Sequence, residues 1–587
     1  MPTDSATVLS ADGTRIAYRE TGDRGAPTVV LLHGYPDTSR IWDEVAGRLA
    51  GRFHVVAYDV RGAGASGAPH GVEGYSLARL EEDFFAVADA VSPDRGVHLV
   101  GHDWGSIQGW EPVTSPGASS RIASYTSMSG PCLDHVGHWR RERRTWRPRA
   151  VRQLVRQALR SWYVGFFQVP VLPGLLWRVT RGRRFGPTLR RFEGIEPRPG
   201  HPARTLAGDG ARGVKLYRAN VRERLRHPRE RHTDVPVQVI VATRDPWVTP
   251  SLFQGLDRWV SRLWIRSVAA RHWLPRSRPE LVARWVGELV DHAEGGPEAP
   301  ALRRVRVSSD RRPFDDHLVV VTGAGSGIGR ATALAFAEQG AAVVAADLDP
   351  ATAERTAALA GSLGPAAHAY GVDVSDAEAM ESFAKAVEHE HGVPDVVVNN
   401  AGVGVAGPFL DTSVEEWERV FDVNVWGVIH GSRLFGRQMV ERGDGGHIVN
   451  LASAAAFVPS RTLPAYATSK AAALMLTECL RAELADEGVG VTAICPGVID
   501  TAIASTTRFV GVTSDEADEQ RRAAVRLYTR RGFTPDRVAD EILRAVRADA
   551  AVVAVAPEAK VLQAIGRFTP KLARALARRN ASPGGQR

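Results

Sequence analysis

Short apolar runs recur along the chain, and amphipathic stretches separate them. Such runs lie at residues 29–32, 54–58, 97–100, 237–242 and 263–265, and again at 318–321 and 342–346. Consecutive Val, Leu, Ile and Ala residues are typical of strands that are buried on both faces, as in a parallel sheet. Strands that alternate with helices predict an α/β fold, with its chemistry at the carboxyl ends of the strands.

The alternation is interrupted twice, and the interruptions divide the chain. Residues 136–232 are rich in Arg and Trp and predict helices, which we interpret as a lid within a first domain of residues 1–290. In this lid, Leu154, Leu159 and Trp162 are expected to share an apolar face. Residues 291–313 are polar and rich in Gly and Pro, and they predict a linker. A second domain over 314–560 and a basic amphipathic tail over 561–587 follow.

Composition and charge limit the partners of the chain. Of its 587 residues 44% are hydrophobic and 24% charged, and the net charge is +8. The positive excess is mostly Arg in residues 139–192 and in the tail, without any zinc-finger or RNA-binding motif, so we expect no nucleic-acid partner. A solvated basic lid is favoured, and peripheral contact with anionic lipid stays open. Three cysteines, no signal peptide and no long apolar run predict a cytoplasmic protein, with membrane association left open.

The segment Gly101-His102-Asp103-Trp104-Gly105 joins a predicted strand to a predicted helix. Small residues on both sides of a central residue are typical of a nucleophile elbow, because the turn is too tight for larger side chains. Asp103 stands in the nucleophile's place, and a carboxylate with a reference pKa of about 3.9 can attack without first losing a proton. Taken alone, the pentapeptide also fits a helix N-cap at Asp103.

Groups that a nucleophile needs follow at the ends of other predicted strands. Tyr35, in His33-Gly34-Tyr35-Pro36, and Trp104 offer backbone N–H groups for an oxyanion hole. Asp245 follows the run at 237–242, and His272 follows the run at 263–265. The order nucleophile, acid, base is that of the α/β-hydrolases.

On these motifs, residues 1–290 resemble the epoxide hydrolases of the α/β-hydrolase fold, whose His-Gly-x-Pro and nucleophile motifs are both present. Tyr163 and Tyr217 lie in contexts similar to the two ring-opening tyrosines of that family's lid, although a lone tyrosine usually serves in packing. The resemblance implies that Asp103 opens an epoxide to an alkyl ester while the two phenols protonate the alkoxide. His272, oriented by Asp245, would then activate water and release a vicinal diol. A haloalkane dehalogenase, which shares the Asp nucleophile and the following Trp, is the alternative.

A glycine-rich turn, Thr322-Gly323-Ala324-Gly325-Ser326-Gly327-Ile328-Gly329, lies between the run at 318–321 and a predicted helix. Such a turn lets a pyrophosphate approach a helix N-terminus. Asp347 ends the next run, where a carboxylate accepts hydrogen bonds from a ribose and repels a 2′-phosphate, so NAD is favoured over NADP. Tyr466 and Lys470 face one side of a helix, and a neighbouring ammonium lowers the pKa of a phenol and makes it a usable acid/base.

Residues 314–560 resemble the short-chain dehydrogenase/reductases, which implies a Rossmann-type, doubly wound parallel sheet. The resemblance implies catalytic roles for Tyr466, Lys470, Ser453 and Asn424, with Ser453 orienting the substrate oxygen and Asn424 helping to hold Lys470 and a water. No metal site is predicted, and no cofactor is predicted for the first domain. The expected NAD-binding residues are Gly323, Gly325, Ser326, Gly327, Ile328, Gly329, Asp347, Asp373, Val374, Asn400, Ala401, Gly402, Tyr466, Lys470, Pro496, Gly497 and Thr501.

The chain as a whole resembles actinobacterial fusions of an epoxide hydrolase with a short-chain dehydrogenase. This implies a bifunctional enzyme acting on small-molecule or lipid epoxides, alcohols and ketones, in lipid metabolism or detoxification, and a homo-oligomer formed through the second domain. Two alternatives stay open. The hydrolase-fold domain could be only a binding or assembly module, or the basic lid and tail could make a peripheral membrane protein in which turnover matters less.

Overall fold

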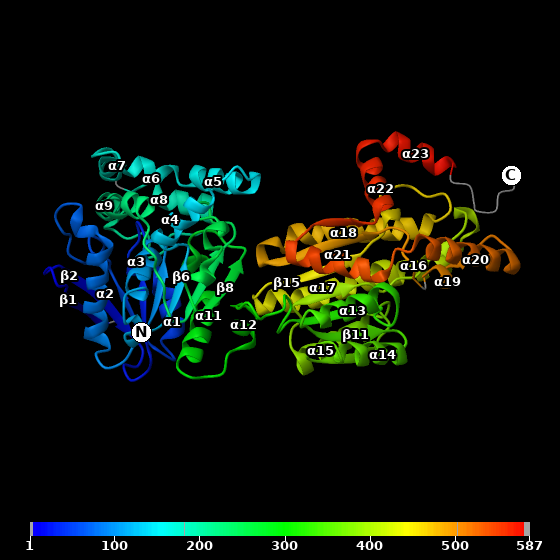
Figure 1. Ribbon diagram of the computed structural model, residues 1–587, viewed down its shortest axis with the longest axis horizontal. Coiled ribbons are helices and arrows are strands. Elements are labelled where there is room, and N and C mark those ends of the chain that lie inside the picture. Colours follow the sequence, from blue (N-terminus) through cyan, green and yellow to red (C-terminus); the bar gives the residue numbers. More distant parts are fainter. Residues whose placement is uncertain (1–3, 181, 502, 580–587) are drawn as a thin grey trace. The chain divides into compact units, whose positions relative to one another are not determined.

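The computed structural model describes residues 4–180, 182–501 and 503–579, so residues 580–587 of the predicted tail lie outside the described part. The chain folds into two compact units, Met1–Asp310 and Arg311–Arg587 (Figure 1). Each unit has its own sheet and its own core. Across the described residues, no helix combines the length and the apolar character needed to cross a bilayer.

The first unit has a nine-stranded sheet of order β1-β2-β4-β3-β5-β6-β7-β8-β9. The six strands from β4 to β8 in this order are parallel, and the two edges are antiparallel. All five apolar runs named for this unit form strands, and β6 lies between β5 and β7 in the sheet. The bounds are β1 (Asp4–Leu9), β2 (Arg15–Thr21), β3 (Thr28–Leu32), β4 (His54–Tyr58), β5 (Val97–His102), β6 (Ile122–Met128), β7 (Val237–Ala242), β8 (Leu263–Val268) and β9 (Arg306–Val307).

Helices cover both faces of this sheet. Side chains of β3 alternate, so that Val30 and Leu32 join the core under α2 and α3, whereas Val29 and Leu31 join the core under α1 and α11. These layers place the carboxyl ends of the parallel strands beneath the lid (Figure 1). The helices are α1 (Asp43–Leu49), α2 (Leu77–Val91), α3 (Trp104–Val113), α10 (Leu274–Ser277), α11 (Pro279–Ala293) and α12 (Pro300–Arg304).

The predicted lid is helical, but its expected apolar face is wrong. Leu154 is half-buried against Val136 and Trp139, whereas Leu159 and Trp162 are 71% and 64% exposed. Five positions on a helix differ by about 140°, so Leu154 and Leu159 cannot face the same neighbour. The lid helices are α4 (Leu133–Glu142), α5 (Pro148–Arg160), α6 (Trp162–Phe167), α7 (Leu172–Thr180), α8 (Phe185–Thr188) and α9 (Leu206–Arg226), with a π-helical turn η4 (Leu189–Glu193).

The predicted linker 291–313 is largely folded onto the first unit. Helix α11 continues to Ala293, α12 buries Leu302 against Trp264 and Leu289, and β9 pairs with β8. Pro at the first turn of α12 favours helix initiation, and Leu302 supplies the apolar anchor. The first unit therefore extends about 20 residues beyond the predicted boundary at 290, to Asp310.

The second unit is a doubly wound sheet of seven parallel strands, in the order β12-β11-β10-β13-β15-β16-β18. Helices α13, α14 and α21 pack on one face, and α15, α17 and α18 on the other. The strands are β10 (Leu318–Thr322), β11 (Ala342–Asp347), β12 (Ala367–Gly371), β13 (Val396–Asn399), β15 (Gly446–Leu451), β16 (Val489–Pro496) and β18 (Val552–Val555), with β14 (Val405–Ala406) and β17 (Arg508–Phe509) paired separately. The helices are α13 (Gly327–Glu338), α14 (Pro350–Gly361), α15 (Ala377–His391), α16 (Val414–Phe421), α17 (Gly427–Arg442), α18 (Pro464–Leu484), α19 (Ile503–Thr506), α20 (Ser514–Arg531), α21 (Pro535–Ala548), α22 (Pro557–Phe568) and α23 (Pro570–Arg579).

Candidate active sites

Asp103 lies in the sharp turn between β5 and α3. Its backbone has φ 53° and ψ −122°, a conformation that residues other than glycine rarely adopt. The neighbouring glycines allow the close packing of this turn, because a Cβ added at Gly34 would stand 2.4 Å from the Asp103 Cβ, and one at Gly105 would stand 2.2 Å from the Leu32 carbonyl oxygen. Asp103 makes no side-chain cap to α3. The turn therefore has the geometry of a nucleophile elbow and not of a simple N-cap.

The two oxygens of the Asp103 carboxylate face different groups. The Tyr35 backbone N–H donates to Oδ1 at 2.7 Å. The His272 Nε2 lies 3.5 Å from Oδ2. Trp104, the other predicted oxyanion donor, opens α3 directly after Asp103. One carboxylate oxygen is thus held by a backbone amide, while the other faces an imidazole.

His272 is oriented by Asp245. The distance between His272 Nδ1 and Asp245 Oδ2 is 2.8 Å, and the N–H groups of Trp247 and Val248 donate to Asp245 Oδ1. Burial alone would lower the pKa of His272, but the charges of Asp245 and Asp103 raise it well above its ordinary value. Burial alone would raise the pKa of Asp245, but the paired His272 lowers it below its ordinary value. The three buried side chains form an ion-paired triad.

The lid delivers two phenols to this site. Tyr163 in α6 and Tyr217 in α9 have ring centroids 5.9 Å apart, and Tyr217 packs edge-on against both Trp104 and Tyr35. Burial raises the pKa of each phenol, and the negative charge of Asp103 raises it further. Both side chains therefore stay protonated at neutral pH and can donate a hydrogen bond or a proton.

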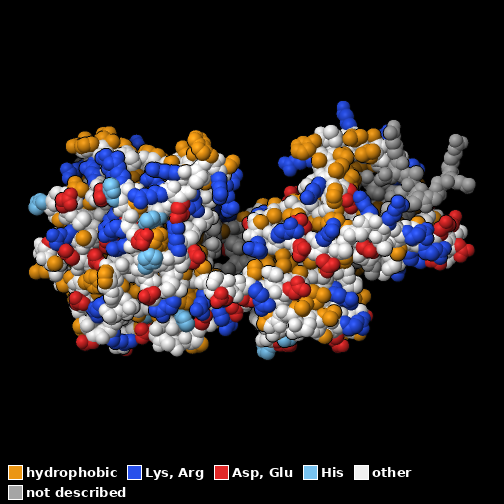
Figure 2. Space-filling model, in the orientation of Figure 1, with side chains coloured by type: hydrophobic (Ala, Val, Ile, Leu, Met, Phe, Trp, Pro, Cys, Tyr) orange, Lys and Arg blue, Asp and Glu red, His pale blue; other side chains and the backbone are white. Residues whose placement is uncertain are grey.

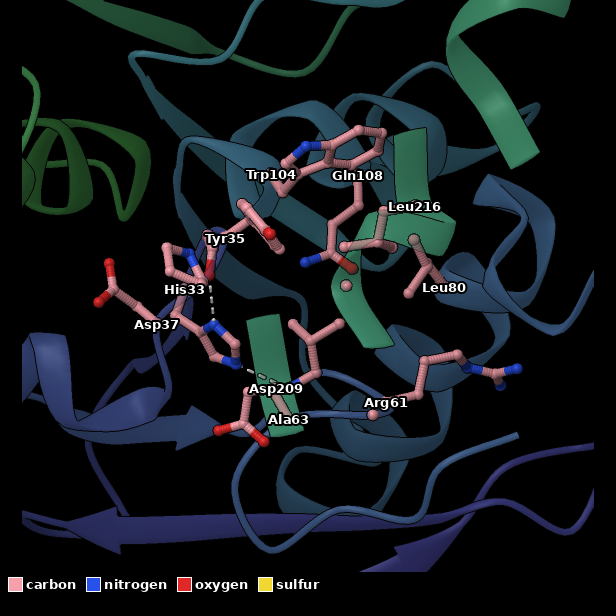
Figure 3. A pocket seen from close by; sticks show the side chains of 15 residues that line it. His33, Tyr35, Asp37, Arg61, Ala63, Leu80, Trp104, Gln108, Asp209 and Leu216 are labelled. Carbon is pink, nitrogen blue, oxygen red and sulfur yellow. Dashed lines mark hydrogen bonds between the residues drawn. The ribbon is translucent and has the colours of Figure 1, made fainter. Parts of the chain in front are cut away.

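A small cavity borders the oxyanion loop, with a volume of about 20 Å³ (Figure 3). Its lining includes Tyr35, Trp104, Leu216, Gln108 and Asp209. Within the described residues, neither amide atom of the Gln108 side chain has a hydrogen-bond partner, although this side chain is buried. The cavity has room for about one water, which would satisfy such a group.

In the second unit, the glycine-rich turn is built to accept a phosphate group. A Cβ at Gly329 would stand 2.1 Å from the Gly323 carbonyl oxygen, and Gly323 and Gly327 have positive φ. The Asn400 amide donates to the carbonyl oxygens of Thr322 and Gly323 and fixes the turn. The Gly325 N–H donates to Asp347 Oδ2 at 2.7 Å, which holds this carboxylate at the end of β11. The residues fit a dinucleotide that lies against the N-terminus of α13.

A pocket of about 620 Å³ leads from this turn to the predicted catalytic residues. Ser453, Tyr466 and Lys470 all line it. Lys470 is 4% exposed, its Nζ donates to the Leu451 carbonyl oxygen at 2.8 Å, and burial lowers its pKa from 10.5 to about 8. Asn424, in the π-helical turn η8 (Asp422–Trp426), bonds to the Val403 backbone and Ser469 and is not among the residues that line the pocket. Its help in holding Lys470 and a water stays a prediction.

Comparisons with known proteins match a part of each unit to a family. A family model for the α/β-hydrolase fold matches residues 27–171, and one for short-chain dehydrogenases matches residues 317–509. Over 583 residues the chain is 47% identical to EphD of Mycobacterium tuberculosis, described as a probable oxidoreductase, and 98% of both chains is covered. This chain belongs to the EphD family. It joins an α/β-hydrolase fold to a short-chain dehydrogenase, as the motifs predicted.

Other relatives cover only the second unit of this EphD-family protein. The 2,3-dihydro-2,3-dihydroxybenzoate dehydrogenase of Bacillus subtilis is 40% identical over 188 residues, which is 32% of this chain and 72% of that enzyme. A solved short-chain dehydrogenase from Burkholderia phymatum, in complex with NAD, is 30% identical and covers 47% of this chain and 99% of its own, with a TM-score of 0.41.

The structure of the EphD-family protein gathers the predicted residues into these two sites. Of the expected NAD-binding residues, Gly325 and Gly329 shape the turn, and all the others line the pocket. Three contributors were missed. Glu193 accepts a hydrogen bond from the Trp273 N–H beside His272, and burial raises its pKa. Glu558, near the end of the predicted second domain, and Leu562, in the predicted tail, form part of the dehydrogenase pocket wall. No short motif marks any of them.

Proposed function

We propose that the first unit of this EphD-family protein hydrolyses epoxides to vicinal diols through an alkyl ester on Asp103. The proposal rests on the different neighbours of the two Asp103 carboxylate oxygens. Oδ2, which faces His272, attacks an epoxide carbon and becomes the alkyl oxygen of the ester. Oδ1, held by the Tyr35 N–H, becomes its carbonyl oxygen and carries the negative charge when water attacks.

Ring opening needs an acid, because an alkoxide is a poor leaving group. Tyr163 and Tyr217 supply two protonated phenols beside the nucleophile. A departing halide would need only hydrogen-bond donors and no proton, so paired phenols support epoxide opening over the dehalogenase alternative.

The charge on His272 depends on the state of Asp103. In the free enzyme, the carboxylates of Asp103 and Asp245 hold the imidazole protonated. Alkylation removes the charge of Asp103, so the pKa of His272 falls. His272 then gives its proton to the phenolate that remains after a tyrosine has protonated the alkoxide. The neutral imidazole then takes a proton from water as the hydroxide adds to the ester carbon. When the diol leaves, carboxylate and imidazolium are restored.

For the second unit, we propose oxidation of an alcohol or reduction of a ketone, with NAD favoured over NADP. A nicotinamide cofactor bound in this pocket would supply the hydride acceptor or donor. Tyr466 exchanges the hydroxyl proton, Ser453 orients the substrate oxygen, and Lys470 stabilises the phenolate form of Tyr466. The Asp347 carboxylate, fixed by the Gly325 N–H, accepts hydrogen bonds from a ribose and repels a 2′-phosphate.

The chemistry of the two units is compatible with a sequence of reactions. The diol formed from a terminal alkyl epoxide carries a secondary hydroxyl group, which belongs to the class of alcohol that we propose for the second unit. Aromatic side chains line the first site and apolar side chains line much of the second, which supports small apolar or lipid substrates. All three cysteines are free, which supports our placing both reactions in the reducing cytoplasm. A homo-oligomer through the second unit stays a prediction, which rests on the resemblance to the short-chain dehydrogenases.

The decisive experiment is a single turnover of a terminal alkyl epoxide in ¹⁸O-labelled water, followed by mass spectrometry of the peptide that contains Asp103. Because water attacks the ester carbon, the label enters Asp103 and not the first diol molecule formed. Asp103→Asn abolishes diol formation, and His272→Gln accumulates the ester. Diol formation that leaves Asp103 unlabelled would contradict the covalent mechanism.

The alternatives give different results in the same experiments. Halide release from haloalkanes without epoxide turnover indicates a dehalogenase, and no hydrolysis of either substrate indicates a binding module. Tyr466→Phe is the matched control, because it removes the acid/base of the second unit only. Consumption of the diol with NAD by the wild type, and not by this variant, is expected if the two units act in sequence.

A further inference from the structure

The outer side of the lid exposes a row of large apolar side chains. Val151, Val155 and Leu159 recur at four-residue intervals along α5 and are 41%, 51% and 71% exposed. Trp162, at the start of α6, and Trp146, just before α5, are 64% and 99% exposed. No residue of α5 is buried. An amphipathic helix in a globular protein normally turns such a row toward the core.

A second row follows on α7. Leu172, Leu175, Leu176 and Val179 fall at helical spacing, and their exposed fractions range from 49% to 70%. Single exposed apolar residues are ordinary, but two rows on helices of one lid are not. In Figure 2, hydrophobic side chains gather over the lid helices of the first unit, with Arg side chains between and below them. We call this surface, formed by α5, α6 and α7, the outer lid face.

The charge of this region is almost entirely positive. Residues 139–192 contain fifteen Arg, no Lys and one acidic residue, Glu142, which gives a formal charge of +14 against +8 for the whole chain. Arg152 and Arg156 are exposed beside the apolar row of α5, and Arg178 is exposed beside that of α7. The region therefore combines apolar side chains that favour removal from water with cations that attract a dense negative charge.

This combination favours a lipid surface over a protein. Two copies of the outer lid face would bring equal positive charges together, so self-association through it is opposed. An anionic bilayer accommodates both apolar and cationic side chains, since acyl chains take the apolar side chains, headgroups take Arg, and Trp prefers the interface between them.

We propose that the outer lid face binds the surface of an anionic phospholipid bilayer. Helices α5 and α7 lie in the interface, with the apolar rows inserted and the Arg side chains at the phosphates. The proposal rests on the outer lid face alone and does not depend on the proposed hydrolase and dehydrogenase reactions. It requires no spanning helix.

Vesicle sedimentation with the full-length protein tests the proposal. The probes are vesicles of phosphatidylcholine alone and of phosphatidylcholine with about 30% phosphatidylglycerol, near the anionic content that makes basic segments bind. We expect binding to the anionic vesicles only, weakened at least about ten-fold when salt rises from 0.05 to about 0.5 M, because the Debye length shrinks. Equal binding to both vesicle types, or none to either, would overturn the proposal.

Surface variants locate the binding site. Trp146→Ser combined with Val155→Ser and Leu159→Ser should weaken binding by at least about ten-fold, since each exposed apolar side chain contributes through buried area. The matched control is Leu9→Ser combined with Leu359→Ser, two exposed leucines on β1 and α14 that should leave binding unchanged. An Arg152→Glu/Arg156→Glu variant tests the charge without altering the apolar row.

The same set of variants also tests whether the protein is folded and whether another surface makes the contact. NAD-dependent activity and thermal unfolding of each variant report whether the chain is intact. If removal of residues 570–587 abolishes vesicle binding while the lid variants retain it, the tail is the contact and the proposal is wrong. If the free protein associates with itself in sedimentation equilibrium and the lid variant does not, the outer lid face is a protein interface and the proposal is likewise wrong.

Discussion

Replacing Lys470 by Met should stabilise the second unit at neutral pH and abolish its dehydrogenase activity. The Lys470 ammonium is 4% exposed, and burial lowers its pKa from 10.5 to about 8. A shift of about 2.5 pKa units corresponds to about 3 kcal/mol of unfavourable charge burial at pH 7. Methionine has a similar shape but leaves the Leu451 carbonyl oxygen without its donor, a loss of about 1–2 kcal/mol. The variant should therefore be more stable by about 1–2 kcal/mol at pH 7.

The pH dependence gives the sharper test. Between pH 8 and 10.5 the unfolded wild type binds the lysine proton and the folded protein does not, so the free energy of unfolding of the wild type rises with pH in this window. Lys470→Met has no such proton, and its advantage should shrink by about 3 kcal/mol across the window. Dehydrogenase kcat/KM of the wild type should fall above pH about 8, because the ammonium that stabilises the phenolate form of Tyr466 is lost.

Urea unfolding of the full chain at several pH values measures this difference. The transition of the second unit is the one that NADH shifts in the wild type, because a ligand stabilises only the unit that binds it. Lys385→Met is the matched control, since Lys385 is an exposed lysine of the same unit paired with Glu381. Its stability should stay within about 0.5 kcal/mol of the wild type. If the difference between wild type and Lys470→Met does not change between pH 7 and 10.5, the buried ammonium has no energetic penalty and the reasoning fails.

Three further substitutions test the two sites. Gly34→Ala places a Cβ 2.4 Å from Asp103 and should reduce diol formation at least about 100-fold with NAD-dependent activity retained, because the nucleophile must shift; unchanged hydrolysis would contradict the packing argument. Asp347→Ala should lower the ratio of kcat/KM for NAD to that for NADP by about 10–100-fold, and an unchanged ratio would mean that another group selects the cofactor. Leu562→Ala removes part of the dehydrogenase pocket wall, so KM should change with alcohol chain length while cofactor affinity does not.

Site residues are easiest to predict from the sequence where they directly follow a buried strand. Asp103, Asp245 and His272 each come shortly after an apolar run, and parallel strands bring their carboxyl ends to one edge, so the three could be grouped without knowing the fold in detail. The turn at Gly323 is equally local, because the strand, the turn and the helix that shape it are consecutive.

Prediction fails where distant segments decide which face of a helix is covered. Nothing local indicates that α22 folds back so that Leu562 lies against Phe457, because this contact spans about a hundred residues. The same holds for Leu302, whose burial against Trp264 turned an expected linker into part of the first unit. On α5, a pattern that predicts an apolar face is present, yet the neighbours that would cover it are not.

That uncovered face has a consequence for the site beneath it. Trp162 and Tyr163 are consecutive residues of α6, yet Trp162 is 64% exposed whereas the Tyr163 phenol is buried beside Tyr217 and feels the charge of Asp103. Helix α6 has only six residues. A ligand that displaces Trp162 is therefore expected to move Tyr163, the proposed proton donor next to it. Arg160, which donates to the Asp245 carbonyl oxygen, ties the end of α5 to the triad as well. Because α5 and α6 carry both the outer lid face and these contacts to the site, we expect anionic vesicles to change the rate of diol formation, and an equal rate with and without vesicles would contradict this coupling.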